Sequence, residues 1–142
     1  MLIPEGSSIP RKPPFYNRSQ EVITTAKRVL IVDDEPVIAD TLVIIFVKAG
    51  YHARSAYSAE EALKIIPLWR PDLAIIDVIL PNMNGIDLAL RIKAEAPECW
   101  LSLFSGASHT ADLVAAAPYS FEVHAKPVHP REMLALASRL LS

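Results

Sequence analysis

The chain has 142 residues, with 14 lysines and arginines and 16 aspartates and glutamates, which is the length of one domain with nearly balanced charge. With 51% hydrophobic and 21% charged residues it is too apolar to be disordered throughout, and its single cysteine excludes an internal disulfide. Its apolar runs are too short to span a membrane, and a net charge of −2 gives no electrostatic reason to bind nucleic acid. We therefore expect a cytoplasmic protein without direct contact to membranes or nucleic acids.

Residues 1–27 differ in composition from the rest of the chain. They contain Pro4, Pro10, Pro13 and Pro14 and carry four basic and two acidic residues, a net charge of +2. Residues 28–142 carry 10 basic and 14 acidic residues, a net charge of −4. We expect a flexible proline-rich N-terminal extension before the domain. The alternative is a strap, in which Phe15 and Tyr16 dock on the domain or on a partner.

From residue 28 onward, short β-branched runs alternate with longer stretches of helical periodicity. This alternation is typical of parallel strands joined by crossover helices, so we expect a doubly wound α/β domain over residues 28–142. The expected strands are 29–32, 51–55, 73–76, 100–104 and 121–125. The expected helices are 36–49, 58–67, 86–96, 111–117 and 131–141.

Local signals mark the ends of the first two helices. Pro36 suits the first turn of a helix, and Gly50 is a natural residue to follow its end. Ser58 and Glu61 match a capping box, in which the two residues satisfy each other's free backbone donors. We expect the second helix to stop at Pro67, because proline interrupts helical hydrogen bonding.

Polar residues follow four of the five expected strands. Asp33 and Asp34 come after the first strand, Asp77 after the third, Ser105 after the fourth and Lys126 after the fifth. The carboxyl ends of parallel strands lie on one edge of the sheet, where ligands bind in folds of this kind. We therefore expect these five side chains to converge.

Three carboxylates at one place repel each other and require a cation. Oxygen ligands suit Mg²⁺, which is completed by waters and phosphate oxygens, so the pattern predicts phosphoryl chemistry. Asp77 is the candidate nucleophile, Lys126 would neutralise the phosphoryl group, and the Ser105 hydroxyl could donate to one of its oxygens. Taken singly, each residue could instead be a helix cap, a turn residue or a solvated lysine.

Three segments carry a family resemblance: Val-Leu-Ile-Val-Asp-Asp-Glu-Pro at 29–36, Asp-Leu-Ala-Ile-Ile-Asp-Val-Ile-Leu-Pro-Asn-Met-Asn-Gly at 72–85, and Lys126-Pro127. Together they resemble the receiver domain of two-component response regulators, a CheY-like superfamily, over about residues 28–142. The resemblance implies a flavodoxin-like, five-stranded parallel sheet in the order 2-1-3-4-5 with five helices. It also implies a cis Lys126–Pro127 bond.

The resemblance also assigns roles at the site. Asp77 would accept a phosphoryl group from a histidine kinase, a histidine phosphotransfer protein or a small phosphodonor. Asp34, Asp77 and the backbone carbonyl of Ile79 would ligate Mg²⁺, and Asp33 would hold a metal-bound water. The Ser105 hydroxyl would act as the switch, and Lys126 would pair with the acyl phosphate.

Three positions depart from the usual receiver pattern. Receivers commonly carry an aromatic residue three positions before the lysine, and here that residue is Val123. Phe121 or His124 could take its place, or could simply pack in the strand. Ile79 and Ala107 are apolar where the family tunes hydrolysis, so neither can orient a water, and we expect a long-lived phosphoaspartate.

The first helix is apolar on more than one side. Its inward stripe is expected to comprise Ile38, Leu42, Ile45 and Ala49, with Phe46 partly inward. The other side then carries Val43, Ile44 and Val47, and an exposed apolar patch of this kind marks a docking surface. By resemblance, the partner would be the kinase or the phosphotransfer protein, with a homodimer as a second possibility. Burial under the N-terminal extension is the alternative.

We expect a stand-alone receiver that is not an enzyme and that switches its binding to a downstream protein target. Two alternatives stay open: a receiver-like binding module that takes no phosphate, and a phosphatase with an aspartate nucleophile. The phosphatase fits less well, because enzymes of the haloacid dehalogenase type use an Asp-x-Asp pair, and Asp77-Val78-Ile79 lacks the second acid.

Overall fold

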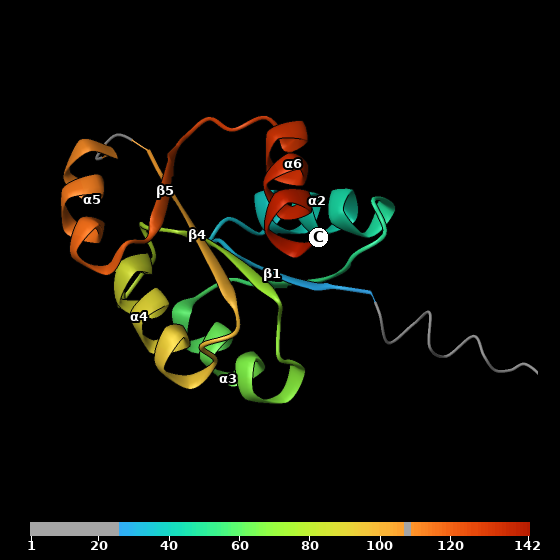
Figure 1. Ribbon diagram of the computed structural model, residues 1–142, viewed down its shortest axis with the longest axis horizontal. Coiled ribbons are helices and arrows are strands. Elements are labelled where there is room, and N and C mark those ends of the chain that lie inside the picture. Colours follow the sequence, from blue (N-terminus) through green and yellow to red (C-terminus); the bar gives the residue numbers. More distant parts are fainter. Residues whose placement is uncertain (1–25, 107–108) are drawn as a thin grey trace, which may run out of the picture.

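A parallel β-sheet forms the centre of the computed structural model, which describes residues 26–106 and 109–142 (Figure 1). The sheet order is β2-β1-β3-β4-β5, and every neighbouring pair is parallel. The strands are β1 (Arg28–Val32), β2 (His52–Ala56), β3 (Leu73–Asp77), β4 (Trp100–Ser105) and β5 (Glu122–Ala125). The predicted strand order is therefore confirmed.

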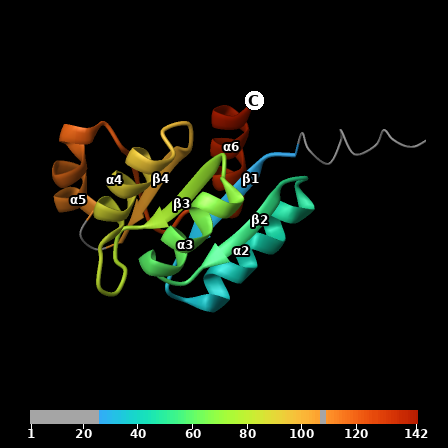
Figure 2. The same ribbon diagram turned by 90° about the horizontal axis from the view of Figure 1, so that it is seen from below.

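Helices cover both faces of the sheet (Figures 1 and 2). Helices α2 and α6 lie over one face, and α3, α4 and α5 lie over the other. The helices are α2 (Pro36–Lys48), α3 (Ala59–Trp69), α4 (Gly85–Glu95), α5 (His109–Ala116) and α6 (Pro130–Leu141), with a 3₁₀ turn, η2 (Ala117–Tyr119). This is the flavodoxin-like arrangement that the family resemblance implies.

The continuous apolar runs of the central strands follow from burial on both faces. In β1, Leu30 and Val32 point into the cluster under α3 and α4, whereas Val29 and Ile31 point into the cluster under α2 and α6. Because side chains alternate along a strand, a strand covered on both sides needs apolar residues at every position. In β1 and β3 the polar residues therefore come only at the ends of the strand.

Two helix boundaries differ from the prediction by two residues, and the other helix ends agree within one residue. Helix α3 continues through Pro67 to Trp69 and ends at Arg70, which adopts the left-handed conformation with φ 54°. Pro67 lies in the last turn, where its missing N–H removes a single hydrogen bond and the buried Ile66 still anchors the helix. Helix α5 begins two residues earlier than expected, at His109, and Pro118 falls in the 3₁₀ turn that follows.

The predicted inward stripe of the first helix was partly wrong. Helix α2 buries Ala39, Leu42 and Phe46, whereas Ile38 is 40% exposed and Ala49 is exposed. Phe46 is the largest of these side chains, and it is fully buried with its ring edge-on to Tyr51 at 5.5 Å. Packing of this ring sets the rotation of the helix.

The expected outward set of α2 changes accordingly. Val43 is half-buried against the core and does not belong to the exposed patch. Ile44 and Val47 are exposed, at 56% and 52%. Val37, which was not predicted, is exposed on the first turn at 79%.

Some expectations fall on residues that the structure does not describe. Residues 1–25 of the N-terminal extension, with Phe15 and Tyr16, lie outside the described part of the chain, and so does Ala107. Among residues 26–106 and 109–142, no helix is long and apolar enough to cross a membrane.

Candidate functional site

Three carboxylates meet at the carboxyl edge of the sheet. Asp33 and Asp34 follow β1, and Asp77 is the last residue of β3, the neighbouring strand. Each can place a carboxylate oxygen within 4.8 Å of the other two. The convergence expected from the sequence is therefore present in the fold.

Backbone hydrogen bonds fix two of these acids. The Asp33 N–H donates to the Ala56 carbonyl at 3.1 Å, and Asp33 Oδ1 accepts from the Glu35 N–H at 2.9 Å. Asp33 is only 5% exposed, whereas Asp34 is exposed. Asp77 Oδ1 accepts from the N–H of Ile79 at 3.1 Å, which holds the carboxylate at the mouth of the site.

Lys126 supplies the positive charge of the site. Its Nζ donates to Asp77 Oδ2 at 2.9 Å and lies 3.7 Å from Asp33 Oδ2. The backbone that carries Lys126 is tied to β4, because its N–H donates to the Ser105 carbonyl at 2.7 Å. The Lys126–Pro127 bond is cis, as the resemblance implies.

Ser105 lies at the end of β4, and its side chain is buried. In the register of the sheet, Asp77 pairs with Phe104, the residue before Ser105. Ser105 in turn pairs with Ala125, the residue before Lys126. All five side chains that the sequence singled out therefore lie on one edge of the sheet.

The electrostatic environment shifts two pKa values. Burial is the main cause that raises the pKa of Asp33, and the charges of Asp77 and Asp34 add to it, while the Glu35 N–H and Lys126 oppose it. For Lys126, burial lowers the pKa, but the hydrogen bond to Asp77 and the nearby acids outweigh it, so its pKa is raised overall. Lys126 therefore stays cationic at neutral pH.

Substituting Asp33 with asparagine is expected to stabilise the metal-free protein. The asparagine Oδ1 can still accept from the Glu35 N–H, while the buried negative charge beside Asp34 and Asp77 disappears. We expect the free energy of unfolding at neutral pH to rise by about 1 kcal/mol in urea denaturation. The control is Asp87→Asn, which neutralises an exposed carboxylate in the first turn of α4 and should not raise the stability, because the helix dipole favours a carboxylate there.

The pH dependence of this effect has a defined sign. Because the pKa of Asp33 is raised by folding, its ionised form costs stability above that pKa, and the cost disappears as the pH falls through it. The difference in unfolding free energy between Asp33→Asn and the parent should therefore shrink on acidification. A difference that grows as the pH falls would contradict the assignment.

Gly85 is a site residue that the sequence analysis did not identify. A Cβ at this position would lie 2.4 Å from the Asp77 carbonyl oxygen and 2.8 Å from the Val78 Cα. The Gly85 N–H donates to the Val78 carbonyl at 2.7 Å, and Asn84 caps α4 by accepting from the Asp87 N–H. The first turn of α4 thus lies directly against the backbone of Asp77. In the sequence, the Asn84-Gly85 pair was the signal that a helix begins close to this strand end.

The donor set suits a hard divalent cation. All three acids offer oxygen ligands, and the site is open on the side of Asp34. Carboxylates with free positions for water and phosphate oxygens fit Mg²⁺. The N–H of Ile79 is engaged with Asp77, and the role of its carbonyl as a metal ligand stays a prediction.

Sequence comparisons agree with this geometry. A family model described as "Response regulator receiver domain" matches residues 29–138. "DNA-binding response regulator MtrA" from Mycolicibacterium smegmatis is 30% identical over 113 residues, which cover 79% of this chain and 49% of that protein. "Alkaline phosphatase synthesis transcriptional regulatory protein PhoP" from Bacillus subtilis is 29% identical over 116 residues, covering 81% and 48%. The chain therefore spans about half the length of these curated relatives.

Solved structures show the same fold. A CheY-like receiver domain protein from Methanospirillum hungatei JF-1 superposes with a TM-score of 0.76 at 30% identity, over 82% of this chain and 94% of that chain. A "putative response regulator" from Chloroflexus aurantiacus J-10-fl gives a TM-score of 0.73 at 29% identity, over 82% and 98%. Because the family match extends from β1 into α6 and includes every residue of the acidic site, the chain belongs to the response regulator receiver domain family of two-component systems.

Proposed function

We propose that this receiver acts in the cytoplasm as a Mg²⁺-dependent phosphoryl acceptor, with Asp77 as the acceptor. The observation that carries the proposal is the placement of Asp77 between a cation and two further acids. Lys126 Nζ lies 2.9 Å from its Oδ2, and Asp33 and Asp34 lie within 4.8 Å. No other acid in the described residues belongs to such a cluster.

The carboxylate would act as a nucleophile. An Oδ of Asp77 attacks the phosphorus of the donor, the bond from phosphorus to the donor's nitrogen or oxygen breaks, and the donor leaves with the electron pair. The products are an aspartyl phosphate and free histidine, or acetate when acetyl phosphate is the donor. Mg²⁺ bound by Asp34 and Asp77, with Asp33 behind them, would neutralise the phosphoryl oxygens.

The neighbouring side chains would then respond to the new charge. A phosphoryl group adds about −1.5 to −2 charges and new acceptor oxygens. The Lys126 ammonium would pair with these oxygens, and the Ser105 hydroxyl would donate to one of them. Because Ser105 and Lys126 are tied through the backbone at the ends of β4 and β5, their movement would bias the adjoining surface and change its affinity for a downstream protein target.

The phosphoaspartate is expected to be long-lived. The Ile79 side chain lies two residues after Asp77, is 59% exposed, and has no group that could orient an attacking water. We expect the purified phosphoprotein to lose its phosphate with a half-life well beyond seconds, measured by intact mass after removal of the donor. Ile79→Asn should shorten the half-life, and a parent half-life of seconds would contradict the prediction.

The exposed apolar side chains of α2 are our candidate docking surface for a histidine kinase or a phosphotransfer protein. Val37, Ile44 and Val47 are exposed, whereas Val43 is half-buried and is removed from the set. We expect Ile44→Asp with Val47→Asp to slow phosphotransfer from the partner at least tenfold, as loss of a few buried methyl groups would do. Uptake from acetyl phosphate should be unchanged. Gel filtration of the same variant tests the alternative of a homodimer.

The proposed function is tested by incubating the chain with Mg²⁺ and acetyl phosphate and weighing the intact protein. We expect one added phosphoryl group, and none when the metal is removed with a chelator. Turnover of many phosphoesters would instead indicate the phosphatase. A mass that never rises with any donor would indicate a binding module that takes no phosphate.

A further inference from the structure

A second hollow lies at the amino edge of the sheet, opposite the acidic site. It is a groove with a volume of about 310 Å³, between the starts of β4 and β5 and the ends of α4 and α6. Trp100, Pro97, Tyr119, Phe121, Lys93 and Leu140 are among the residues that line it. We call it the aromatic groove. None of the phosphoryl-site residues contributes to it.

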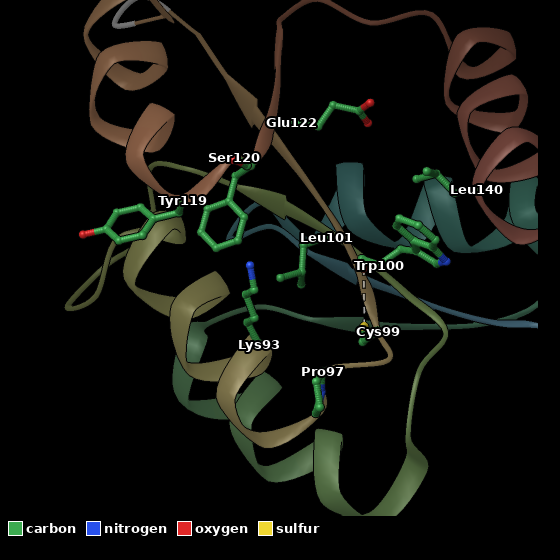
Figure 3. Close-up of a pocket in the computed structure, with 10 residues that line it drawn as sticks. Lys93, Pro97, Cys99, Trp100, Leu101, Tyr119, Ser120, Glu122 and Leu140 are labelled. Atoms are coloured by element: carbon green, nitrogen blue, oxygen red, sulfur yellow. Dashed lines mark hydrogen bonds between the residues drawn. The ribbon is translucent and has the colours of Figure 1, made fainter.

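The aromatic groove presents apolar rings to solvent. Trp100 is 52% exposed and Tyr119 is 41% exposed, which is unusual for side chains of this size. Figure 3 shows Trp100 beside Leu140 at one end of the groove and Lys93 and Tyr119 at the other. The Tyr119 and Phe121 rings lie 5.8 Å apart, and Lys93 Nζ is 5.7 Å from the Phe121 ring centre. Grooves lined by aromatic rings are suited to proline-rich segments, whose pyrrolidine rings stack on them.

The chain carries a segment of matching chemistry. Residues 10–16 read Pro-Arg-Lys-Pro-Pro-Phe-Tyr, in which Pro10 and Pro13 have the Pro-x-x-Pro spacing of polyproline II ligands. Pro-x-x-Pro ligands in general favour polyproline II before they bind, so docking such a segment costs little conformational entropy. Net charge favours the approach of the extension to the domain as a whole, because residues 1–27 carry +2 and residues 28–142 carry −4.

The geometry of the chain allows the segment to reach the aromatic groove. The described part begins at Ala26, at the same sheet edge as the groove. Asp72 bridges the two, because its N–H donates to the Arg28 carbonyl at 2.8 Å and its own carbonyl accepts from the Trp100 N–H at 2.9 Å. Because β3 lies between β1 and β4, Trp100 and Arg28 are separated by twice the distance between neighbouring strands, roughly 10 Å. The ten residue-to-residue steps from Tyr16 to Ala26 span up to about 35 Å.

We propose that residues 10–16 of the same chain dock in the aromatic groove, with Pro10, Pro13 and Pro14 against Trp100 and Tyr119. The contact ties the N-terminal extension to the amino edge of the domain. This contact involves none of the residues of the acidic site at the opposite edge. An experiment that confirms or refutes the docking therefore leaves the proposed phosphoryl acceptance untouched.

A paramagnetic label on the extension tests this proposal in the full chain. Ser8→Cys supplies an attachment point for a nitroxide. The native Cys99 does not compete, because it is buried and burial raises the pKa of its thiol to about 12. We expect the indole N–H of Trp100 and the amides of 119–122 to lose most of their NMR intensity. The amides of 82–84, at the opposite edge, should keep theirs.

The matched control removes the docking residues but keeps the label. In the labelled chain, Pro10→Ser with Pro13→Ser and Pro14→Ser should restore the Trp100 signal, whereas Pro4→Ser should leave it broadened. Trp100 signals that keep their intensity in the labelled parent would overturn the proposal. Broadening that appears only when labelled chains are mixed with ¹⁵N chains without label would also overturn it, since the occupant would then be a second copy.

Discussion

Replacing Asp77 with asparagine is expected to abolish phosphoryl uptake. The amide keeps the shape of the side chain, and its oxygen can still accept from the Ile79 N–H. It has no anionic oxygen to attack phosphorus, however, and it loses its ion pair with Lys126. We expect the rate of mass gain from acetyl phosphate to fall at least about 10³-fold, the scale seen when a nucleophile is removed.

The control for this variant is Asp87→Asn. Asp87 is an exposed aspartate on the first turn of α4, eight positions beyond Ile79 and outside the acidic cluster. Intact mass should show the parent level of phosphorylation for Asp87→Asn and none for Asp77→Asn, with both variants folded by circular dichroism. If Asp77→Asn gained a phosphoryl group at the parent rate, the acceptor would have to be another residue.

The sheet and the acidic site could be predicted because both depend on local patterns and simple topology. A strand buried on both faces is apolar at every position, so β1 and β3 are visible as uninterrupted runs. Once the strands are parallel, the residue that follows each run must lie on the same edge. The convergence of Asp33, Asp77 and Lys126 could therefore be predicted from their positions after the strands alone.

The rotation of α2 could not be predicted because the helix is apolar on several sides. The pattern offers two nearly equal stripes, and the choice depends on where the Phe46 ring fits between Tyr51 and the sheet. The rotation of the helix thus depends on the packing of the Phe46 ring, which the hydrophobic periodicity of the sequence does not reveal. The prediction therefore placed Val43 on the surface, whereas it is half-buried against the core.

The aromatic groove was also invisible in the sequence. Lys93, Trp100 and Tyr119 belong to three elements, and each alone is an ordinary surface residue. Only the packing of α4 beside β4 and the 3₁₀ turn before β5 brings them together. The close approach of Gly85 to Asp77 has the same origin, because it depends on how α4 lies over the end of β3.

Gly85→Ala is expected to be the most destabilising single-methyl change near the site. The added Cβ would lie 2.4 Å from the Asp77 carbonyl oxygen and 2.8 Å from the Val78 Cα, and neither backbone atom can rotate away. Either α4 moves outward or the end of β3 shifts, at a cost of about 3 kcal/mol. For a domain of this size, that corresponds to a decrease in Tm of roughly 10 °C in thermal denaturation.

The comparison with Gly106→Ala separates crowding from the general effect of replacing glycine. Gly106 follows Ser105 on the same sheet edge, but a Cβ there meets no atom of the described residues within 4 Å, so the Tm of Gly106→Ala should stay close to that of the parent. Because the Gly85→Ala shift falls on the backbone of Asp77 itself, phosphoryl uptake should also slow in that variant under conditions where it is fully folded. Equal Tm values for the two variants would mean that α4 can move away from Asp77 without cost, and that Gly85 does not position Asp77.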